Sequence, residues 1–331
     1  MSEPELTRSV WEIDSTGYPT SKSTDEKIGF LLRYAILAPS SHNSQPWRFC
    51  VSGNVVDIGA DESRWLDAAD QTKRELYISV GCAIENLCVA AERFELEPRV
   101  EYHGGTDTDT VATVTLREDS EPSNHRPPKL FDAITDRSTS HNPFDDRTLD
   151  TTVRDELDGV VVEEDVTLHL VDDPETKGAI SELQAKADRL QMDDPEYRTE
   201  LGHWIGNGAL GSSWLMARIG QAVVTHLDPG DREAAKNSKL IQSTPVVAVL
   251  KTRADDPTAQ AFERIALLAS TEDIAVHPMS QTLERPGMRE QLEHLLPDDA
   301  GRPQHLFRLG YTDGEAKHTP RWPLKTFLAE A

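Results

Sequence analysis

Apolar residues recur every three to four positions in several segments of this chain of 331 residues, and this spacing predicts amphipathic helices. Helices are expected over residues 26–38, 71–94, 129–136 and 284–296, with further helices within 175–227. Runs rich in β-branched and aromatic residues predict strands near 47–51, 55–58, 98–102, 111–116, 166–171, 245–251 and 304–311. Helices and strands do not alternate strictly, so an α+β fold is predicted rather than a doubly wound parallel sheet.

A weak internal repeat links the two halves of the chain. Residues 83–91 read AIENLCVAA and residues 261–269 read AFERIALLA, so the two segments share alanine, glutamate and aliphatic positions. Both segments have helical apolar spacing, and a short apolar stretch follows each of them. The repeat indicates an internal duplication. A chance likeness between two buried helices is the alternative.

Composition shifts divide the chain into segments. A stretch rich in proline and polar residues at 121–128 is typical of a boundary. We therefore expect an N-terminal extension over residues 1–24, a first lobe over 25–120 and a second lobe over 121–331. The second lobe carries a helical insertion at about 175–243 that has no counterpart in the first lobe. Its aromatic residues and glycines are compatible with a lid or with plain core packing.

A polar corner follows the first predicted helix. Residues 38–47 read APSSHNSQPW, and the proline ends the helix because it cannot donate the next helical N–H. Two hydroxyls, an imidazole and two carboxamides then lie close together, which suits a ligand with many hydrogen-bonding groups. A simple helix-to-strand turn capped by its own serines is the alternative interpretation.

Charge and composition limit the partners and the cellular compartment that are expected for this protein. The net charge is −24, with 34 basic and 58 acidic residues, and the basic residues comprise 23 arginines and 11 lysines. This excess would repel nucleic acid and anionic membranes, so neither partner is expected. Scattered acids with few lysines resemble proteins of salt-loving organisms, whose high salt screens the repulsion. Three cysteines without paired spacing and the lack of a long apolar run predict a cytoplasmic protein.

The corner motif resembles the signature of the nitroreductase family of FMN-dependent enzymes. With the internal repeat, the whole chain resembles the Acg-type branch, in which two half-sequences imitate the usual dimer. The resemblance implies two nitroreductase-like lobes, each a mixed β-sheet flanked by helices, that form an intramolecular pseudo-dimer. It implies that the loop with Pro39, Ser40, Ser41 and Asn43 contacts a flavin held by the other lobe.

The resemblance also implies a phosphate-binding segment at residues 136–144, which read DRSTSHNPF. It assigns Arg137 to the phosphate, Ser138 and Thr139 as hydroxyl donors, and His141 as the second cation of the segment. A planar guanidinium matches phosphate oxygens well. Near the C-terminus the motif PRWPL makes Arg321 the other expected phosphate ligand, whereas Arg308 is expected to pair with surface acids.

After the second repeated helix, Glu272 and Asp273 match by position a turn that contacts the flavin edge in the family. The first lobe lacks the phosphate motif and the second lobe lacks the signature loop, so one FMN per chain is expected. No Walker, Gly-x-Gly-x-x-Gly, Gly-x-Ser-x-Gly or zinc-binding motif is present, and the histidines lack metal-ligand spacing. No catalytic side chain and no metal are predicted.

The sequence is compatible with three functions. The first is an FMN-dependent oxidoreductase, in which NAD(P)H reduces the flavin and a nitro- or quinone-like small molecule reoxidises it. The second is an FMN-binding protein that stores or sequesters flavin under a lid without turnover. The third is a pair of degenerate lobes without a cofactor, acting through protein contacts. The chain is expected to be a monomeric pseudo-dimer or a homodimer.

Overall fold

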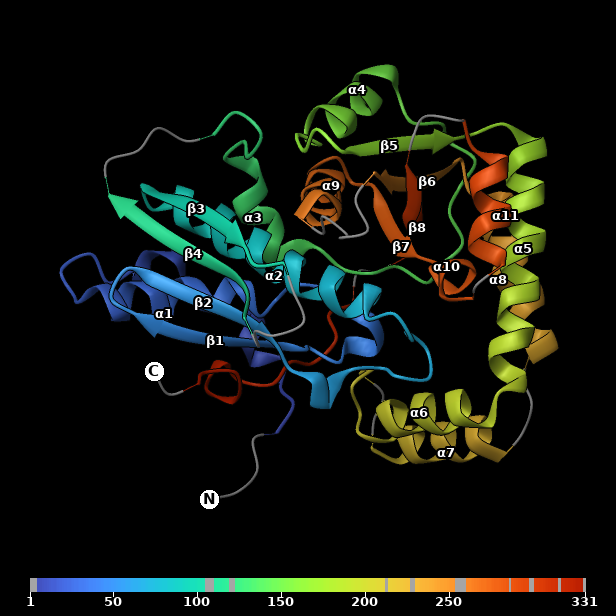
Figure 1. Cartoon of the computed structure of the whole chain (residues 1–331), viewed down its shortest axis with the longest axis horizontal. Coiled ribbons are helices and arrows are strands. Elements are labelled where there is room, and N and C mark those ends of the chain that lie inside the picture. The colour runs from blue at the N-terminus through green and yellow to red at the C-terminus, as the bar shows by residue number, and fades with distance from the viewer. Residues whose placement is uncertain are drawn as a thin grey trace.

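The computed structural model describes residues 5–104, 110–118, 123–211, 214–226, 230–253, 260–285, 287–297, 301–314 and 317–329. Its strands form two four-stranded sheets packed side by side, with helices around and between them (Figure 1). The first sheet contains β1 (Trp47–Ser52), β2 (Val55–Ala60), β3 (Leu96–Tyr102) and β4 (Thr110–Glu118). The second contains β5 (Val166–Val171), β6 (Val246–Thr252), β7 (Ala275–Pro278) and β8 (Arg302–Gly310). The predicted α+β class is thereby confirmed.

The two sheets share one topology. The strand order is β1-β2-β4-β3 in the first and β5-β6-β8-β7 in the second. The register shifts in the β2–β4 pair at Ile58/Gly59 and in the equivalent β6–β8 pair at Leu250/Lys251. All pairings between the named strands are antiparallel. Parallel contacts in the described residues are isolated bridges on the edge strands β1 and β7, so the expected mixed pairing is limited to sheet edges.

The two repeated helices occupy equivalent places. Helix α2 (Arg74–Arg93) lies between β2 and β3, and α9 (Gln260–Thr271) lies between β6 and β7. The two helices pack on each other, and one hydrophobic core runs through both lobes. Both helices are almost wholly buried, which explains why their apolar residues run nearly all the way round.

Local signals set the ends of the first helix. Helix α1 (Thr24–Ala35) begins at a capping box in which the Ser23 side chain and Glu26 satisfy each other's backbone N–H. It ends three residues before the predicted end, because the residues before Pro39 turn away from the helix. The predicted helix at 129–136 is confirmed as α3 (Lys129–Asp136).

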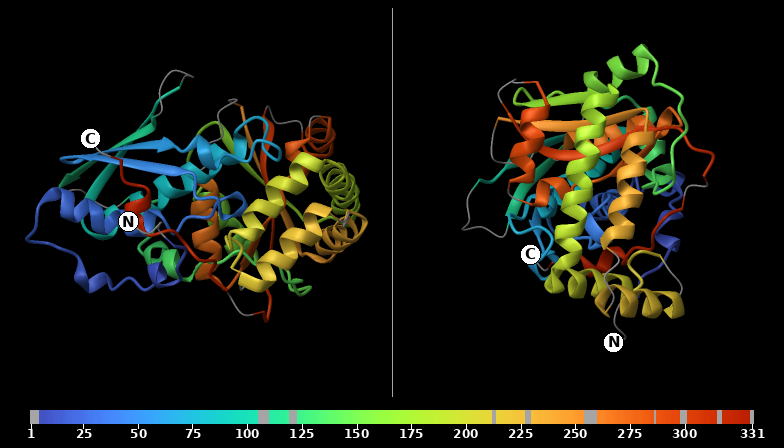
Figure 2. Two further views of the ribbon diagram at one scale, coloured as in Figure 1. Left: turned by 90° about the horizontal axis from the view of Figure 1, so that it is seen from below. Right: turned by 90° about the vertical axis from the view of Figure 1, so that its right-hand side faces the viewer.

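The insertion between β5 and β6 is entirely helical in its described part. It comprises α5 (Pro174–Asp193), α6 (Pro195–Gly206), α7 (Trp214–His226) and α8 (Gly230–Ser243). Helices α5 and α8 lie side by side against the second sheet, and the α6–α7 pair runs across their ends (Figure 2). Gly202 and Gly206 are required where α6 meets α7, because a Cβ at either position would collide with Gln221 or Thr225.

Three helices were not predicted at their observed positions. Helix α4 (Thr151–Gly159) has only two large aliphatic residues, Val153 and Leu157, and therefore gives little periodic signal. The predicted helix at 284–296 is divided into α10 (Gln281–Glu284) and α11 (Met288–Leu295), whereas α8 lies beyond 175–227 but within the predicted helical insertion of about 175–243. Gly287 between α10 and α11 has a positive φ of 45°, which ends the first and starts the second.

The C-terminal segment crosses to the first lobe. The backbone of Phe49 on β1 donates to Phe327 and accepts from Ala329, both at 2.8 Å, and Arg321 pairs with Thr7. Residues 320–329, which the sequence assigned to the second lobe, therefore pack on the first. The unpaired edge of β1 explains the crossing, since it offers free backbone groups to the segment. Residues 121–122 of the expected boundary lie outside the described residues.

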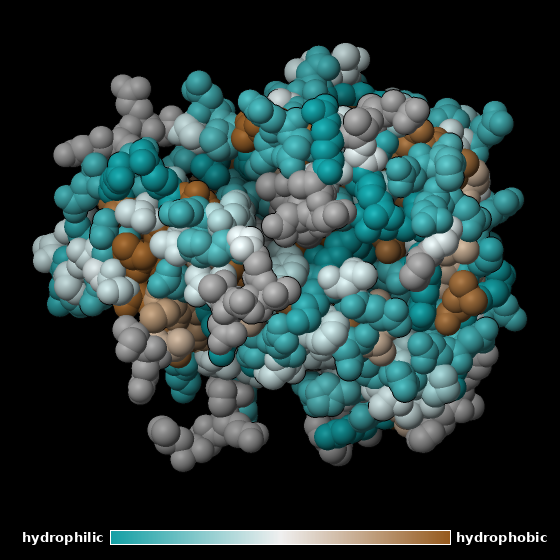
Figure 3. Space-filling model, viewed as in Figure 1, coloured by the Kyte–Doolittle hydropathy of each residue, from teal (hydrophilic) through white to brown (hydrophobic). Residues whose placement is uncertain are grey.

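The visible face of the molecule is mostly hydrophilic, with small separate apolar areas, as the net charge leads one to expect (Figure 3). Among the described helices none has the length and apolar character needed to cross a membrane.

Candidate functional site

The signature loop is strained and firmly held. His42, Asn43 and Gln45 all have positive φ angles, of 50°, 55° and 53°. Such angles are unfavourable for residues other than glycine and occur often at functional sites. The Ser40 hydroxyl accepts a hydrogen bond from the Gln45 N–H at 2.9 Å, and the Gln45 side chain accepts one from the Trp322 N–H at 3.1 Å. The loop is therefore fixed by its own side chains and by the C-terminal segment.

Asn43 ties the signature loop to two distant segments. Its buried carboxamide donates to the carbonyls of Ala209 and Pro320, both at 2.8 Å, and accepts a hydrogen bond from Arg321. Ala209 follows α6 of the insertion, and Pro320 belongs to the C-terminal segment. One side chain thus joins the first lobe, the insertion and the C-terminus.

Arg137 and Arg321 meet beside this loop. The Nη2 atoms of both donate to the Leu37 carbonyl, at 3.1 and 3.3 Å, and Arg321 also donates to the carbonyl of Ala38 at 3.1 Å. Both guanidiniums are at least 95% buried, and the Nε atom of each has no hydrogen-bond partner. The structure thereby brings together Asn43, Arg137 and Arg321, which come from three distant parts of the sequence.

The buried charges around Arg137 and Arg321 are not balanced. The Glu263 carboxylate on α9 lies 3.4 Å from the Arg137 Nε, and its charge also acts on Arg321. Burial raises the pKa of Glu263 to about 7, and burial together with the charge of Arg137 lowers the pKa of Arg321 to about 9. Two buried guanidiniums facing one buried carboxyl leave a positive surplus, which is costly unless an anion joins them.

The segment that follows Arg137 runs beside β7. Thr139 forms a parallel bridge with Val276, and the Ser140 N–H donates to the Val276 carbonyl at 3.0 Å. The His141 ring lies 4.4 Å from the His277 ring. Ser138 and Thr139 are partly exposed. They are the two residues that follow Arg137 in the chain.

Arg308 does not pair with surface acids, contrary to our expectation. It is fully buried, stacks on Phe144 at 4.0 Å, and donates to His277 Nδ1 at 2.9 Å and to the Asn142 carbonyl at 2.7 Å. Burial lowers the pKa of Arg308 to about 10. Strand β8 is central in its sheet, so the Arg308 side chain is enclosed by the protein. It holds the segment 136–144 through the Asn142 carbonyl.

The structure does not bring Glu272 and Asp273 to the other predicted residues. The Glu272 carboxylate contacts Lys129 at 2.7 Å and belongs to a surface group with α3. Asp273 has a φ of 56° in the turn that ends α9. His277, four residues later, contacts the phosphate segment instead. Strand β7 carries the chain from this turn toward the segment that follows Arg137.

Ser41 and its neighbours lie at the entrance to α2. The Ser41 hydroxyl donates to Glu75 at 3.0 Å, and Pro39 and Ser40 are partly exposed. Sequence reasoning missed Glu75 and Glu263 as neighbours of the site. The repeated glutamate at positions 85 and 263 was the available signal for Glu263, because both are buried and each faces arginines.

The insertion covers the signature loop. Trp204 on α6 is 93% buried and packs with Leu66, Ala69, Tyr197 and Ala209. Its ring also lies 6.4 Å from the ring of Trp322 in the C-terminal segment, and Tyr197 approaches His42 at 6.3 Å. Glu200 of the same helix accepts hydrogen bonds from the N–H groups of Ala68 and Ala69 at 3.1 and 3.0 Å.

We expect Trp204→Ala to loosen the α6–α7 pair, because removing a buried tryptophan costs roughly 3–5 kcal/mol. Trypsin should then cleave at the exposed Arg218 at least about tenfold faster, since local opening exposes the helix. Limited proteolysis followed by mass spectrometry measures this. Leu190→Ala on α5, where the side chain is 44% exposed, is the control and should leave the cleavage rate unchanged. Equal cleavage of both variants would contradict the covering role of Trp204.

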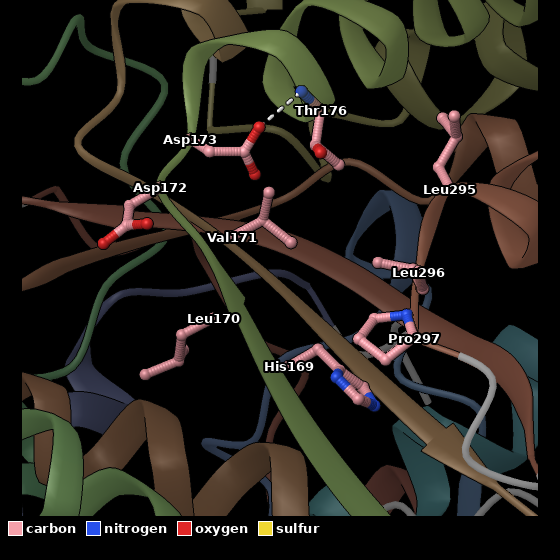
Figure 4. Close-up of a pocket in the computed structure, with 9 residues that line it drawn as sticks. All are labelled: His169, Leu170, Val171, Asp172, Asp173, Thr176, Leu295, Leu296 and Pro297. Atoms are coloured by element: carbon pink, nitrogen blue, oxygen red, sulfur yellow. Dashed lines mark hydrogen bonds between the residues drawn. The ribbon is translucent and has the colours of Figure 1, made fainter.

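A cavity of about 390 Å³ lies elsewhere, between β5, the start of α5 and the end of α11 (Figure 4). His169 and Leu296 line it, but none of the predicted site residues does. Its acidic residues have local roles: Asp172 pairs with Arg154, and Asp173 caps α5 by accepting from Thr176. Among the described residues no group of three His, Cys, Asp or Glu side chains is arranged to hold a metal ion.

Comparison with known proteins gives relatives at low identity. No family model matches the chain. A Mycobacterium tuberculosis protein named "Putative NAD(P)H nitroreductase acg" is 24% identical over 322 residues, covering 92% of this chain and 96% of the relative. An uncharacterised protein of the same organism is 26% identical over 326 residues, covering 90% and 92%.

Solved structures give partial matches. Iodotyrosine deiodinase bound to FMN and 3-iodo-L-tyrosine is 15% identical with a TM-score of 0.42, covering 59% of this chain and 95% of that chain. The FMN- and NADPH-dependent nitroreductase NfnB of a Sphingopyxis strain is 18% identical with a TM-score of 0.39, covering 59% and 93%.

Proposed function

We propose that this chain is an FMN-dependent oxidoreductase of the nitroreductase type, with the two lobes acting as an intramolecular pseudo-dimer. The observation that carries the proposal is the positive surplus where Asn43, Arg137 and Arg321 converge. The residues present fit a phosphate group: two buried guanidiniums meet here, the Arg321 Nε has no hydrogen-bond partner, and hydroxyls follow Arg137 in the chain at Ser138 and Thr139. The names of the relatives favour the same assignment.

In this proposal each residue of the site has a binding role. Arg137 and Arg321 hold the phosphate, Ser138 and Thr139 donate hydroxyl hydrogen bonds, and His141 lies further along the segment. The signature loop, with Pro39, Ser40, Ser41 and Asn43, contributes from the first lobe. When bound, FMN supplies the hydride chemistry, accepting from NAD(P)H and giving to a nitro- or quinone-like acceptor. The protein binds the flavin, orients it and limits access of water through α6.

One FMN per chain is proposed because the equivalent place on α2 has the opposite charge balance. Glu85, which corresponds to Glu263 in the repeat, pairs with Arg126 at 2.7 Å and Arg264 at 3.3 Å. Glu92 and Glu163 also contact these arginines. Three carboxylates for two guanidiniums leave no positive surplus, so a phosphate would be repelled there.

The proposed setting is the cytoplasm, since Cys50, Cys82 and Cys88 form no disulfide in the described structure. Because one chain supplies both lobes, we propose that it needs no second subunit to form the site. Small molecules are the proposed partners, and the acidic surface argues against nucleic acid.

The test starts from the absorption spectrum of the purified protein after saturation with FMN. A yellow protein with one flavin per chain, bleached by NADPH or NADH without oxygen and restored by a nitroarene or a quinone, is the expected result. A flavin that binds but is not reduced would favour the storage function instead, which the comparisons do not favour. A colourless protein that retains no FMN would contradict both.

A further inference from the structure

The two equivalent outer strands of the sheets differ in what covers their edges. Strand β1 is an outer strand of the first sheet, and β5 holds the same place in the second. The edge of β1 is covered by the C-terminal segment: Phe49 donates its N–H to Phe327, and its carbonyl accepts from Ala329, both at 2.8 Å. Among the described residues no segment pairs in this way with the outer edge of β5.

The register of the strands identifies the backbone groups at the edge of β5. The pairing shifts after Ile58 in the first sheet and after Leu250 in the second, so these two residues correspond. Ile58 faces Phe49, and Leu250 faces Leu168, so Leu168 holds the place of Phe49. Opposed residues of an antiparallel pair alternate between bonded and non-bonded pairs. The N–H and the carbonyl of Leu168 therefore point outward, as those of Phe49 do.

The outward groups of β5 are available for pairing. Neither Leu168 nor Leu170, the next residue with the same orientation, makes a backbone hydrogen bond beyond the β5–β6 ladder within the described part of the chain. The Val166 N–H is already used by the Glu163 carbonyl at 3.0 Å, so the available edge begins after Val166. A row of such groups is a template for a further strand.

Strand β5 lacks the features that usually protect an exposed edge. Its six residues read VTLHLV, without proline, lysine, arginine, aspartate or glutamate. The outer strand β3, in contrast, reads LEPRVEY and contains a proline and three charged residues. The outer strand β7 has four residues and is paired by residues 139–140. Because exposed edges are normally charged, short or interrupted by proline, the composition of β5 indicates that another chain pairs with it.

The cavity of about 390 Å³ lies beside this edge (Figure 4). Its apolar lining comes from Leu170 and Val171 of β5 and from residues 295–297 after and at the end of α11. Side chains of an added strand alternate between the two faces of the sheet. Every second side chain of such a strand is therefore directed toward α5 and α11, where an aliphatic group fits the cavity.

The two ends of β5 are strongly acidic. Residues 163–165 read EED before the strand, and residues 172–175 read DDPE after it. Two of these six carboxylates pair with arginines, which leaves both ends together with a negative surplus. A second copy related by two-fold symmetry would pair its own β5 antiparallel and bring acidic ends together, which like charges disfavour. The charges favour a partner with basic residues on either side of apolar ones.

We propose that the outer edge of β5 binds an extended segment of a partner protein, in which apolar residues are flanked by lysines or arginines. The segment pairs with Leu168 through the two backbone hydrogen bonds that Phe49 makes with the C-terminal segment, and it runs parallel to β5 as that segment does to β1. Main-chain bonds then provide affinity, and the cavity and the acidic ends provide specificity. This surface shares no residue with the proposed flavin site, so the inference does not depend on the proposed function.

Fluorescence anisotropy with a labelled synthetic peptide, KKVTVLVKK, tests the proposal on the full chain. The peptide should bind, and EEVTVLVEE should bind at least about tenfold more weakly because its charges have the wrong sign. Two forms of KKVTVLVKK with N-methyl groups on alternate residues remove the backbone donors of one side or the other. One form should bind at least about tenfold more weakly than the other, since only one side faces β5. Equal binding of the two forms, or no binding of KKVTVLVKK, would overturn strand addition.

A pair of matched variants locates the basic ends of the peptide. Glu164 is exposed beside β5, and Glu101 is exposed on β3 of the other sheet. Glu164→Lys should weaken binding of KKVTVLVKK by about fivefold, because it reverses a charge at the proposed contact. Glu101→Lys makes the same change in net charge and should stay within about twofold of the wild type, since salt screens distant charges. Equal weakening by both variants would contradict binding at β5.

Hydrogen exchange followed by mass spectrometry identifies the strand that is covered. Binding of KKVTVLVKK should slow exchange in residues 166–171 and leave residues 96–102 unchanged. Equal slowing in both strands would overturn the assignment to β5. Without peptide, a dimer in which exchange in residues 166–171 slows as the protein concentration rises would also overturn it, because a second copy would then occupy the edge.

Discussion

Arg321→Met is expected to weaken FMN binding by about 100-fold, which corresponds to about 2.7 kcal/mol. In our proposal Arg321 gives the phosphate a charged and bidentate partner, and each hydrogen bond to a charged group contributes about 1.5–3 kcal/mol. Methionine has a similar length but neither charge nor donors. Quenching of FMN fluorescence on titration with protein measures the dissociation constant.

Two further variants complete this experiment. Arg321→Lys keeps the charge but not the planar fork, so it should bind FMN with intermediate affinity. Arg147→Met removes an exposed arginine that stacks on Tyr311, and it should bind like the wild type. Near-UV circular dichroism checks that each variant is folded. An unchanged dissociation constant for folded Arg321→Met would show that the phosphate lies elsewhere.

Glu85→Gln is expected to lower the free energy of unfolding by roughly 3–5 kcal/mol, because it leaves buried arginines without their counter-charge. Glu85 is fully buried and accepts hydrogen bonds from Arg126 at 2.7 and 3.0 Å and from Gln260 at 2.7 Å. It also lies 3.3 Å from Arg264. Urea denaturation followed by circular dichroism measures the difference, with Glu272→Gln as the surface control.

The effect of Glu85→Gln should depend on pH in a defined direction. Burial alone would raise the pKa of Glu85, but Arg126 and Arg264 outweigh it and hold that pKa below its usual range. A carboxyl with a lowered pKa stabilises the fold above its unfolded pKa of about 4.3, and this stabilisation is lost as the pH falls. The gap between wild type and variant should therefore be full at pH 7 and shrink below about pH 4. A constant gap would contradict the ion-pair explanation.

The polar corner at 38–47 shows what sequence patterns predict about the site and what they do not predict. A helix stop followed by crowded polar residues was sufficient to predict a loop with special chemistry at 38–47, and the structure adds three left-handed residues there. The pairing of Asn43 with Arg321 across 278 positions had no signal in periodicity or composition. It followed only from the resemblance to a known motif pair.

The surroundings of Glu272 and of Arg308 are both set by how the strands of the second sheet pair. Glu272 was chosen because it matches by position a turn of the resembled family, but the surroundings of a side chain depend on how β7 pairs with β8 and where residues 138–140 cross β7. Arg308 was expected at the surface because arginine is rarely buried. Its strand is central in the sheet, so its side chain is enclosed, and its Nε and Nη2 donate to an imidazole and to a backbone carbonyl.

The amino-acid sequence by itself determined the elements of this protein: the helix ends at Ser23 and Pro39, the strands, the repeated buried helices and the acidic surface. These features follow from interactions between residues close along the chain or from composition. The tertiary structure alone decided which charges meet. It left a positive surplus at Glu263 and a negative one at Glu85, placed α6 over the signature loop, and brought the Glu75 carboxylate to Ser41. Those balances depend on burial and on contacts between distant segments, where a low dielectric makes each unpaired charge costly.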